Sequence, residues 1–269
     1  MGSFTDYTEN KWLNHTLEGT TFTVPTVVAL AFHTGDPTDV GTANECANAN
    51  NYARKSCKAS FATGAATKII SNDADIVMNQ ASGSWGTVTY WSLWDSATYG
   101  AGNCLATGSF SAGKAIAANQ TPKVLIGEID ISIPASNGMT TYLANEMLDH
   151  TFKSGDGGFA QPTIYMALGN DGGVFADTGV WTYEISTSGT AYARIATAWT
   201  VTGSAATNNG ALTFAIATAS FGNVSQYALA DGDTEGAGNM LLYGDWTGVA
   251  IAADDQVNIP DGDLDITLS

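Results

Sequence analysis

Basic residues are scarce in this 269-residue chain, which has 9 Lys and Arg against 26 Asp and Glu. The resulting net charge of −17 argues against direct nucleic-acid binding, because that needs a basic surface. The same charge argues against docking on anionic lipid. The sequence also lacks any apolar run near the roughly 20 residues of a membrane span. We therefore expect neither nucleic acid nor a membrane among its partners.

Cysteine is rarer still, with three residues. Cys46, Cys57 and Cys104 are too few for a disulfide scaffold, and no second Cys or His pair accompanies them for zinc. Cys46 and Cys57 could close a small loop, with Cys104 left over. The opening residues lack the basic segment and apolar run of a signal peptide, so we expect cytoplasmic synthesis. Free thiols are then the expected state.

Charged residues of both signs make up only 13% of the chain, whereas Gly alone occurs 30 times. Hydrophobic residues reach 44%, which is enough for a packed core. This profile is typical of many short strands joined by turns, with a surface of hydroxyls and amides.

An internal repeat is the strongest signal in the sequence. The segment Asn10 to Leu17 matches Asn145 to Phe152, and five further matches follow in the same order. They pair residues 25–27 with 162–164, 52–54 with 192–194, 85–88 with 221–224, 100–105 with 236–241, and 127–133 with 262–268. We predict two repeats, residues 1–134 and 135–269, joined by a turn at Pro134 to Gly138.

Within each repeat the apolar spacing predicts a short amphipathic helix, Tyr7 to Leu17 and Tyr142 to Phe152. Its expected caps are Thr5 or Asp6 and Thr140 or Thr141, with Gly19 and Gly155 near its end. The expected strands are 26–32, 52–61, 75–79, 86–95, 104–110 and 127–133, and their counterparts 163–168, 192–201, 212–216, 222–231, 240–246 and 264–268. The predicted fold is mainly β: two tandem homologous β-sandwich or barrel-like domains, each opened by a short amphipathic α-helix.

Histidines are the first candidates for chemistry. His15 and His150 occupy the same position in the two opening helices, and His33 stands alone. His150 follows Asp149, which could orient it as a base, but the first repeat has Asn14 there and no nucleophile accompanies either histidine. We interpret both helix histidines as surface or packing residues.

Acidic clusters are the second candidates. The segment Asp231 to Gly236 resembles the first half of a calcium loop, but Leu242 stands where the final bidentate Glu belongs. We interpret it as a turn between strands, with adventitious cation binding as the alternative. The segments Asp36 to Asp39 and Asp261 to Asp265 are interpreted as turns as well.

Aromatic and basic residues complete the search. Trp85, Trp91 and Trp94 could form a carbohydrate platform, but their spacing divides them between strand faces and favours core packing. Arg54 and Arg194 recur at one repeat position and are interpreted as internal ion-pair or loop-anchoring residues. The sequence predicts no catalytic, cofactor-binding or metal-binding residue, and we expect no enzymatic activity.

The motifs of the first repeat follow one another in a defined order. A helix of the form Asn-x-Trp/Met-Leu-x-His precedes Asp36 to Asp39, Asn51 to Arg54, Trp85 to Tyr90, and Asp95 with a Gly-rich turn. The chain resembles tailed-bacteriophage virion proteins, the tail-fibre-like or head-decoration proteins, here duplicated. The second repeat lacks the Asp-Pro-Thr-Asp motif. The resemblance implies a structural virion component, made in the host cytoplasm, and carries over no catalytic residue.

Two structural functions and one enzymatic function follow as hypotheses. The first is a capsid decoration, or cement, protein on the outer capsid surface, which would bind the major capsid protein and form a homo-oligomer, with a trimer favoured. The alternative is a tail-fibre or adhesin subunit, in which exposed tryptophans would bind a host glycan. A β-sandwich enzyme acting on polysaccharide would need two carboxylates across a cleft, and none recurs in such a setting.

Overall fold

A computed structural model describes residues 2–134 and 138–268, and the predicted turn at Pro134 to Gly138 lies partly outside the described residues. The chain forms two compact units, described here one at a time. Unit 1 comprises Met1–Lys11, Thr23–Pro134 and Asn145–Phe159, and unit 2 comprises Trp12–Phe22, Ala135–Ala144 and Ala160–Ser269. Each unit therefore includes a helical segment that belongs, in sequence, to the other repeat. The repeat boundary at 134/135 stays a prediction from sequence.

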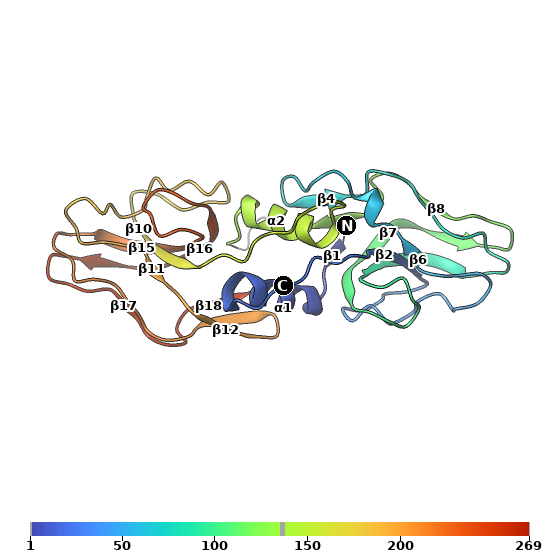
Figure 1. The fold of residues 1–269 in the computed structure, drawn as a ribbon, viewed down its shortest axis with the longest axis horizontal. Helices are drawn as coiled ribbons and strands as arrows, with labels where there is room; N and C mark the ends of the chain where they lie inside the picture. Colours follow the sequence, from blue (N-terminus) through green and yellow to red (C-terminus); the bar gives the residue numbers. More distant parts are fainter. Residues whose placement is uncertain (1, 135–137, 269) are drawn as a thin grey trace. The chain divides into compact units, whose positions relative to one another are not determined.

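Unit 1 is built on one seven-stranded sheet, in the order β3-β2-β6-β7-β1-β9-β4. Figure 1 labels β1, β2, β4, β6 and β7 of this sheet. Strand β1 joins its two parts, because it pairs antiparallel with β7 and parallel with β9. A second, two-stranded sheet pairs β5 with β8. The strands are β1 (Gly2–Phe4), β2 (Ala29–His33), β3 (Lys55–Ser56), β4 (Ile69–Ser71), β5 (Ile76–Val77), β6 (Gly86–Trp94), β7 (Cys104–Ile116), β8 (Lys123–Val124) and β9 (Asp130–Ser132).

Unit 2 repeats most of this plan in separate sheets, ordered β11-β10-β15-β16, β12-β13-β18 and β14-β17. The counterpart of β1 is a single bridge between Met139 and Leu242, so the first two sheets are not joined by a strand within the described residues. The strands are β10 (Tyr165–Asn170), β11 (Ile195–Ala196), β12 (Trp199–Thr202), β13 (Ala205–Asn208), β14 (Leu212–Thr213), β15 (Gly222–Ala230), β16 (Met240–Ile251), β17 (Asn258–Ile259) and β18 (Asp265–Thr267). The prediction of a mainly β fold with two tandem repeats is confirmed.

The two opening helices are α1 (Asp6–Leu13), which continues as a π-helical turn η1 (Asn14–Glu18), and α2 (Thr141–Phe152). Both begin in the same way. The Thr5 hydroxyl accepts the Thr8 N–H and donates to the Cys104 carbonyl at 2.6 Å, and the Thr140 hydroxyl accepts the Leu143 N–H and donates to the Met240 carbonyl at 2.6 Å. These threonines therefore cap the helices and fix them to β7 and β16. No described helix has the length and apolar character of a membrane span.

The second half of α2 packs within unit 1. The Asn145 side chain accepts the Lys68 N–H at 2.9 Å, and Asp149 accepts the Ala65 N–H. Phe152 is fully buried, with its ring 6.0 Å from Phe4 and 6.2 Å from Phe61 between centroids. In unit 2, η1 packs against β12. Each of these helix segments therefore packs against residues of the other repeat.

Strand lengths differ from the predictions in two ways. Strands β6 and β15 agree with the expected ranges, but β7 and β16 run to Ile116 and Ile251, beyond the expected ends at 110 and 246. Residues 111–115 are exposed on both faces, so they carry no apolar alternation to reveal a strand. The expected strand 52–61 holds only β3 and a 3-10 turn, η2 (Lys58–Ser60).

Glu9 on α1 is 9% exposed and lies near other carboxylates. Burial, and then the charges of Asp6 and Asp39, raise the pKa of Glu9 from 4.5 to about 7. Because the folded pKa exceeds the unfolded one, this group's stabilisation is complete below pH 4.5 and is lost as the pH rises through 7.

We expect Glu9→Gln to remove this pH dependence and to raise the free energy of unfolding at pH above 7 by about 1 kcal/mol, allowing for solvent screening. Urea unfolding of the wild type and of the variant, from below pH 4.5 to above pH 7, measures this difference in the free energy of unfolding. Equal pH profiles for the two proteins would contradict the assignment.

Candidate functional site

A buried cluster of Glu, Tyr and Arg occurs once in each unit and is called here the Glu–Tyr–Arg cluster. In unit 1, Arg54 donates two hydrogen bonds to Glu45, at 2.9 and 2.8 Å, and Tyr52 donates a third at 3.1 Å. The Tyr52 hydroxyl also accepts the Phe32 N–H at 3.0 Å. The cluster therefore connects the long loop before β3 to strand β2.

Unit 2 contains the same cluster. Arg194 donates to both Glu184 oxygens, at 2.7 and 2.8 Å, and Tyr192 donates to Glu184 at 3.1 Å and accepts the Leu168 N–H at 3.0 Å. Burial and the nearby glutamate raise the pKa of Tyr52 and of Tyr192. Both tyrosines therefore stay protonated donors, and the interpretation of the arginines as internal ion-pair residues is confirmed.

The arginines also anchor the turn before β7 and β16. Arg54 donates to the Ala101 carbonyl at 2.8 Å, and Arg194 donates to the Ala237 carbonyl at 2.9 Å. Each guanidinium stacks on a tryptophan, but the two tryptophans do not occupy equivalent positions in the two repeats. The distance to the ring centroid is 3.6 Å for Trp94 and 4.0 Å for Trp181. Sequence comparison of the repeats missed the glutamates, because Glu45 lies 9 positions before Arg54 whereas Glu184 lies 10 positions before Arg194, in loops of unlike sequence.

The turns that follow β6 and β15 are closed by equivalent Asp–Asn pairs. Asp95 accepts the backbone and side-chain N–H groups of Asn103 at 2.6 and 2.8 Å, and Asp231 accepts those of Asn239 at 2.7 Å each. The segment Asp231 to Gly236 is thus a turn between strands, as predicted. Within residues 2–134 and 138–268, no three His, Cys, Asp or Glu side chains are grouped so that they could hold a metal ion.

The other acidic segments also form turns. Asp36 accepts the Thr38 N–H at 2.8 Å, and Asp39 accepts the Asp6 N–H at 2.7 Å at the start of α1. Asp261 accepts the Gly210 N–H at 2.7 Å, and Asp265 begins β18. The carboxylates of Asp36, Asp39 and Asp261 bind backbone amides, which explains why Asp is used at these three positions.

All three histidines are buried. His15 Nδ1 accepts the Phe22 N–H at 3.1 Å, and His150 Nδ1 accepts the Phe159 N–H at 3.0 Å, so the interpretation as packing residues is confirmed. His33 contacts the Ala43 carbonyl and the Ser92 hydroxyl, at 2.8 and 2.6 Å. Burial lowers the pKa of His33, so it is neutral at physiological pH.

The tryptophans of the first repeat are core residues. Trp85, Trp91 and Trp94 are 6%, 0% and 3% exposed. Their division between two strand faces does not expose any of them, because both faces of the end of β6 are covered. The interpretation of these three tryptophans as core residues is confirmed, and the alternative of an exposed glycan platform is wrong for them.

The cysteines are free and buried. Burial raises the pKa of each thiol, of Cys46, Cys57 and Cys104, to about 12. We expect the native protein to resist thiol-specific reagents at neutral pH, and all three thiols to react once the protein is denatured. A colorimetric thiol assay with and without denaturant measures this, and rapid labelling of the native chain would contradict it.

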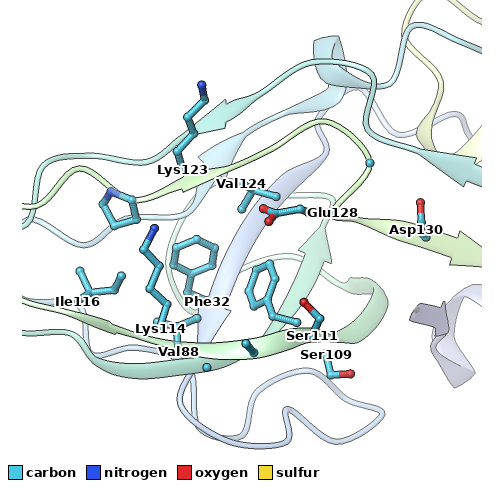
Figure 2. Close-up of a pocket in the computed structure, with 15 residues that line it drawn as sticks. Phe32, Val88, Ser109, Ser111, Lys114, Ile116, Lys123, Val124, Glu128 and Asp130 are labelled. Carbon is cyan, nitrogen blue, oxygen red and sulfur yellow. The ribbon is translucent and has the colours of Figure 1, made fainter.

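A groove lies beside the second half of the long strand in each unit. In unit 1 it has a volume of about 610 Å³ and runs between β7 and the segment that contains β8. Figure 2 shows Phe32, Lys114 and Glu128 directed toward it from different segments, and Lys123 pointing outward. Glu128 accepts the Leu125 N–H at 2.7 Å, and Lys123 pairs with Asp75. Lys114 lines the groove from β7.

The groove of unit 2 lies in the same place and has a volume of about 340 Å³. It is more apolar. Trp246 donates to the Val224 carbonyl at 3.0 Å from its floor, and Val249 on the rim is 57% exposed. The strand pairings Val88–Lys114 and Val224–Val249 show that Lys114 and Val249 occupy the same position. The buried clusters are thus duplicated faithfully, whereas the groove rims differ.

The fold defines a duplicated β-rich module, and each copy contains buried polar clusters and an open groove. A family model described as podophage GP4 fiber I protein gp80 matches the chain twice, over residues 3–132 and 138–267. The chain belongs to this phage family and carries its domain in tandem. It is a virion structural protein. No curated protein matches the chain.

Proposed function

We propose that the chain is a tail-fibre component of a phage virion, with no enzymatic activity. The observation that carries the proposal is the match of both repeats to a family described as a fibre protein. The buried polar clusters support it, because they tie long loops to the strands without presenting a reactive group.

Capsid decoration is the second candidate, and the charge distribution favours it. Residues 140–269 contain 2 basic and 15 acidic residues, whereas residues 1–139 contain 7 and 11. A decoration protein could bind the major capsid protein through the first repeat and expose the more acidic second repeat to solvent. Two linked repeats in a trimer would supply six similar domains on the outer capsid surface.

Electron microscopy of purified virions labelled with gold-conjugated antibody against this chain distinguishes the two candidates. The fibre proposal expects label on the tail or its appendages and a copy number on the order of ten. Label over the whole head, with on the order of hundreds of copies, would overturn it in favour of decoration. Quantitative gel analysis of the same virions supplies the copy number.

A further inference from the structure

The second halves of β7 and β16 are open strand edges. Strand β1 pairs with β7 only at residues 106–108, and β16 is the last strand in its sheet order. Residues 111–115 and 247–250 are exposed. In the described part of the chain, no strand pairs with the side of either segment that faces away from β6 or β15. Backbone groups on such an edge can accept another strand.

Each open edge borders its groove, so an added strand would find both backbone partners and pockets for side chains. The groove of unit 1 has Phe32, Val88 and Val124 among its lining residues, and that of unit 2 has Val224, Trp246 and Ile259. Alternate residues of an added strand point to one face, so half of them would enter the groove.

The two edges differ in charge at equivalent positions. In unit 1, Lys114 and Lys123 accompany the carboxylates of Glu128 and Asp130 on the groove, and Lys123 pairs with Asp75. In unit 2, Val249 and Asn258 replace the lysines, and Asp263 and Asp265 keep the carboxylates. Strand pairing also places Asp245 where unit 1 has Ser109, which adds a third carboxylate.

We propose that a second copy of this chain is the partner, and that the β7 edge of one copy pairs with the β16 edge of the next. Charge complementarity selects this combination. Pairing of two β7 edges would bring Lys114 of one copy toward Lys114 of the other. Pairing of two β16 edges would bring carboxylates together without a compensating basic side chain. Only the unlike pair combines the lysines with the excess carboxylates.

This contact is head-to-tail, so it closes into a ring or extends into a filament according to the rotation between copies. Lys114 disfavours the pairing of one β7 edge with another, whereas the β16 edge carries exposed Val249 at the same position. The divergence of the two rims therefore gives each copy one edge of each kind. The inference does not depend on where the chain lies in the virion.

Sedimentation velocity of the full chain, from about 1 µM to about 1 mM, tests the proposal. We expect the average mass to rise with concentration, and Val249→Lys to weaken this association by about tenfold or more, because it places a lysine opposite Lys114 and its neighbours. Val180→Lys is the matched control: Val180 is an exposed valine of unit 2 away from the edge, and this variant should associate like the wild type.

A second variant separates charge from misfolding. Combining Lys114→Glu with Val249→Lys exchanges the signs of the two edges, and association should return toward the wild-type value. A wild-type chain that stays monomeric throughout would overturn the proposal and leave the edges to another virion protein. Equal association of Val249→Lys and the wild type would also overturn it.

Discussion

Replacing Glu184 with alanine is expected to lower the free energy of unfolding of unit 2 by about 3–5 kcal/mol. The side chains of Glu184 and Arg194 are both 0% exposed, so the substitution leaves a buried guanidinium without its counter-charge. Tyr192 loses its acceptor in the same step. Carbonyl groups of the neighbouring turn still accept from Arg194, but they cannot replace a bidentate carboxylate.

The measurement is denaturant unfolding of the full chain, followed by tryptophan fluorescence. Lys123→Ala is the control, because the Lys123–Asp75 pair has side chains 44% and 34% exposed and should contribute less than about 1 kcal/mol. Glu45→Ala should act in unit 1 as Glu184→Ala acts in unit 2. If Glu184→Ala lowered the free energy of unfolding no more than Lys123→Ala does, the Glu–Tyr–Arg cluster would not be a stabilising framework.

Trp91→Ala is expected to cost about 3–5 kcal/mol, because Trp91 is 0% exposed and its removal leaves a large cavity. The strand β7 is shaped to receive this ring. A Cβ atom added at Gly108 would lie 2.3 Å from Trp91 Cζ2, so only glycine fits there. Gly108→Ala should therefore destabilise unit 1 as well, by overpacking.

Thermal unfolding by circular dichroism measures both variants. Any loss of ligand binding in Trp91→Ala would then follow from loss of the fold and not from loss of a contact. A variant with wild-type stability and a specific binding defect would contradict the placement of Trp91 in the core. Trp246, half-buried in the groove of unit 2, is the better position for testing a surface role.

The sequence predicted those features that depend on local pattern. Apolar spacing gave the two helices, and the two-residue alternation of residues 88–94 gave β6. The repeat then gave β15 as its counterpart, and both strands were predicted within a residue of their observed ends. Arg54 and Arg194 recur at one repeat position in a chain with few basic residues, and this recurrence indicated ion pairs. The repeat was informative because equivalent residues make the same buried hydrogen bonds in both units.

Features that depend on tertiary contacts were missed. Glu45 and Glu184 lie in loops of unlike sequence, and only the folded chain brings them to their arginines. The exposed ends of β7 and β16 have no apolar face, so periodicity could not reveal them, and the grooves beside them escaped notice with them. The inclusion of segment 145–159 in unit 1 is equally invisible to sequence, because an amphipathic face does not specify its partner.

Hydrogen exchange of the full chain tests the central claim most directly, namely that a duplicated buried framework supports two divergent open edges. Asn72 and Asn208 accept the N–H groups of Ile129 and Leu264, each at 2.9 Å, and these amides should be slow and similarly protected in both units. Within residues 111–115 and 247–250, the amides that point away from β6 and β15 should exchange rapidly in dilute protein and more slowly as its concentration rises. Fast exchange at Ile129 or Leu264, or strong protection of both edges in dilute protein, would contradict the account.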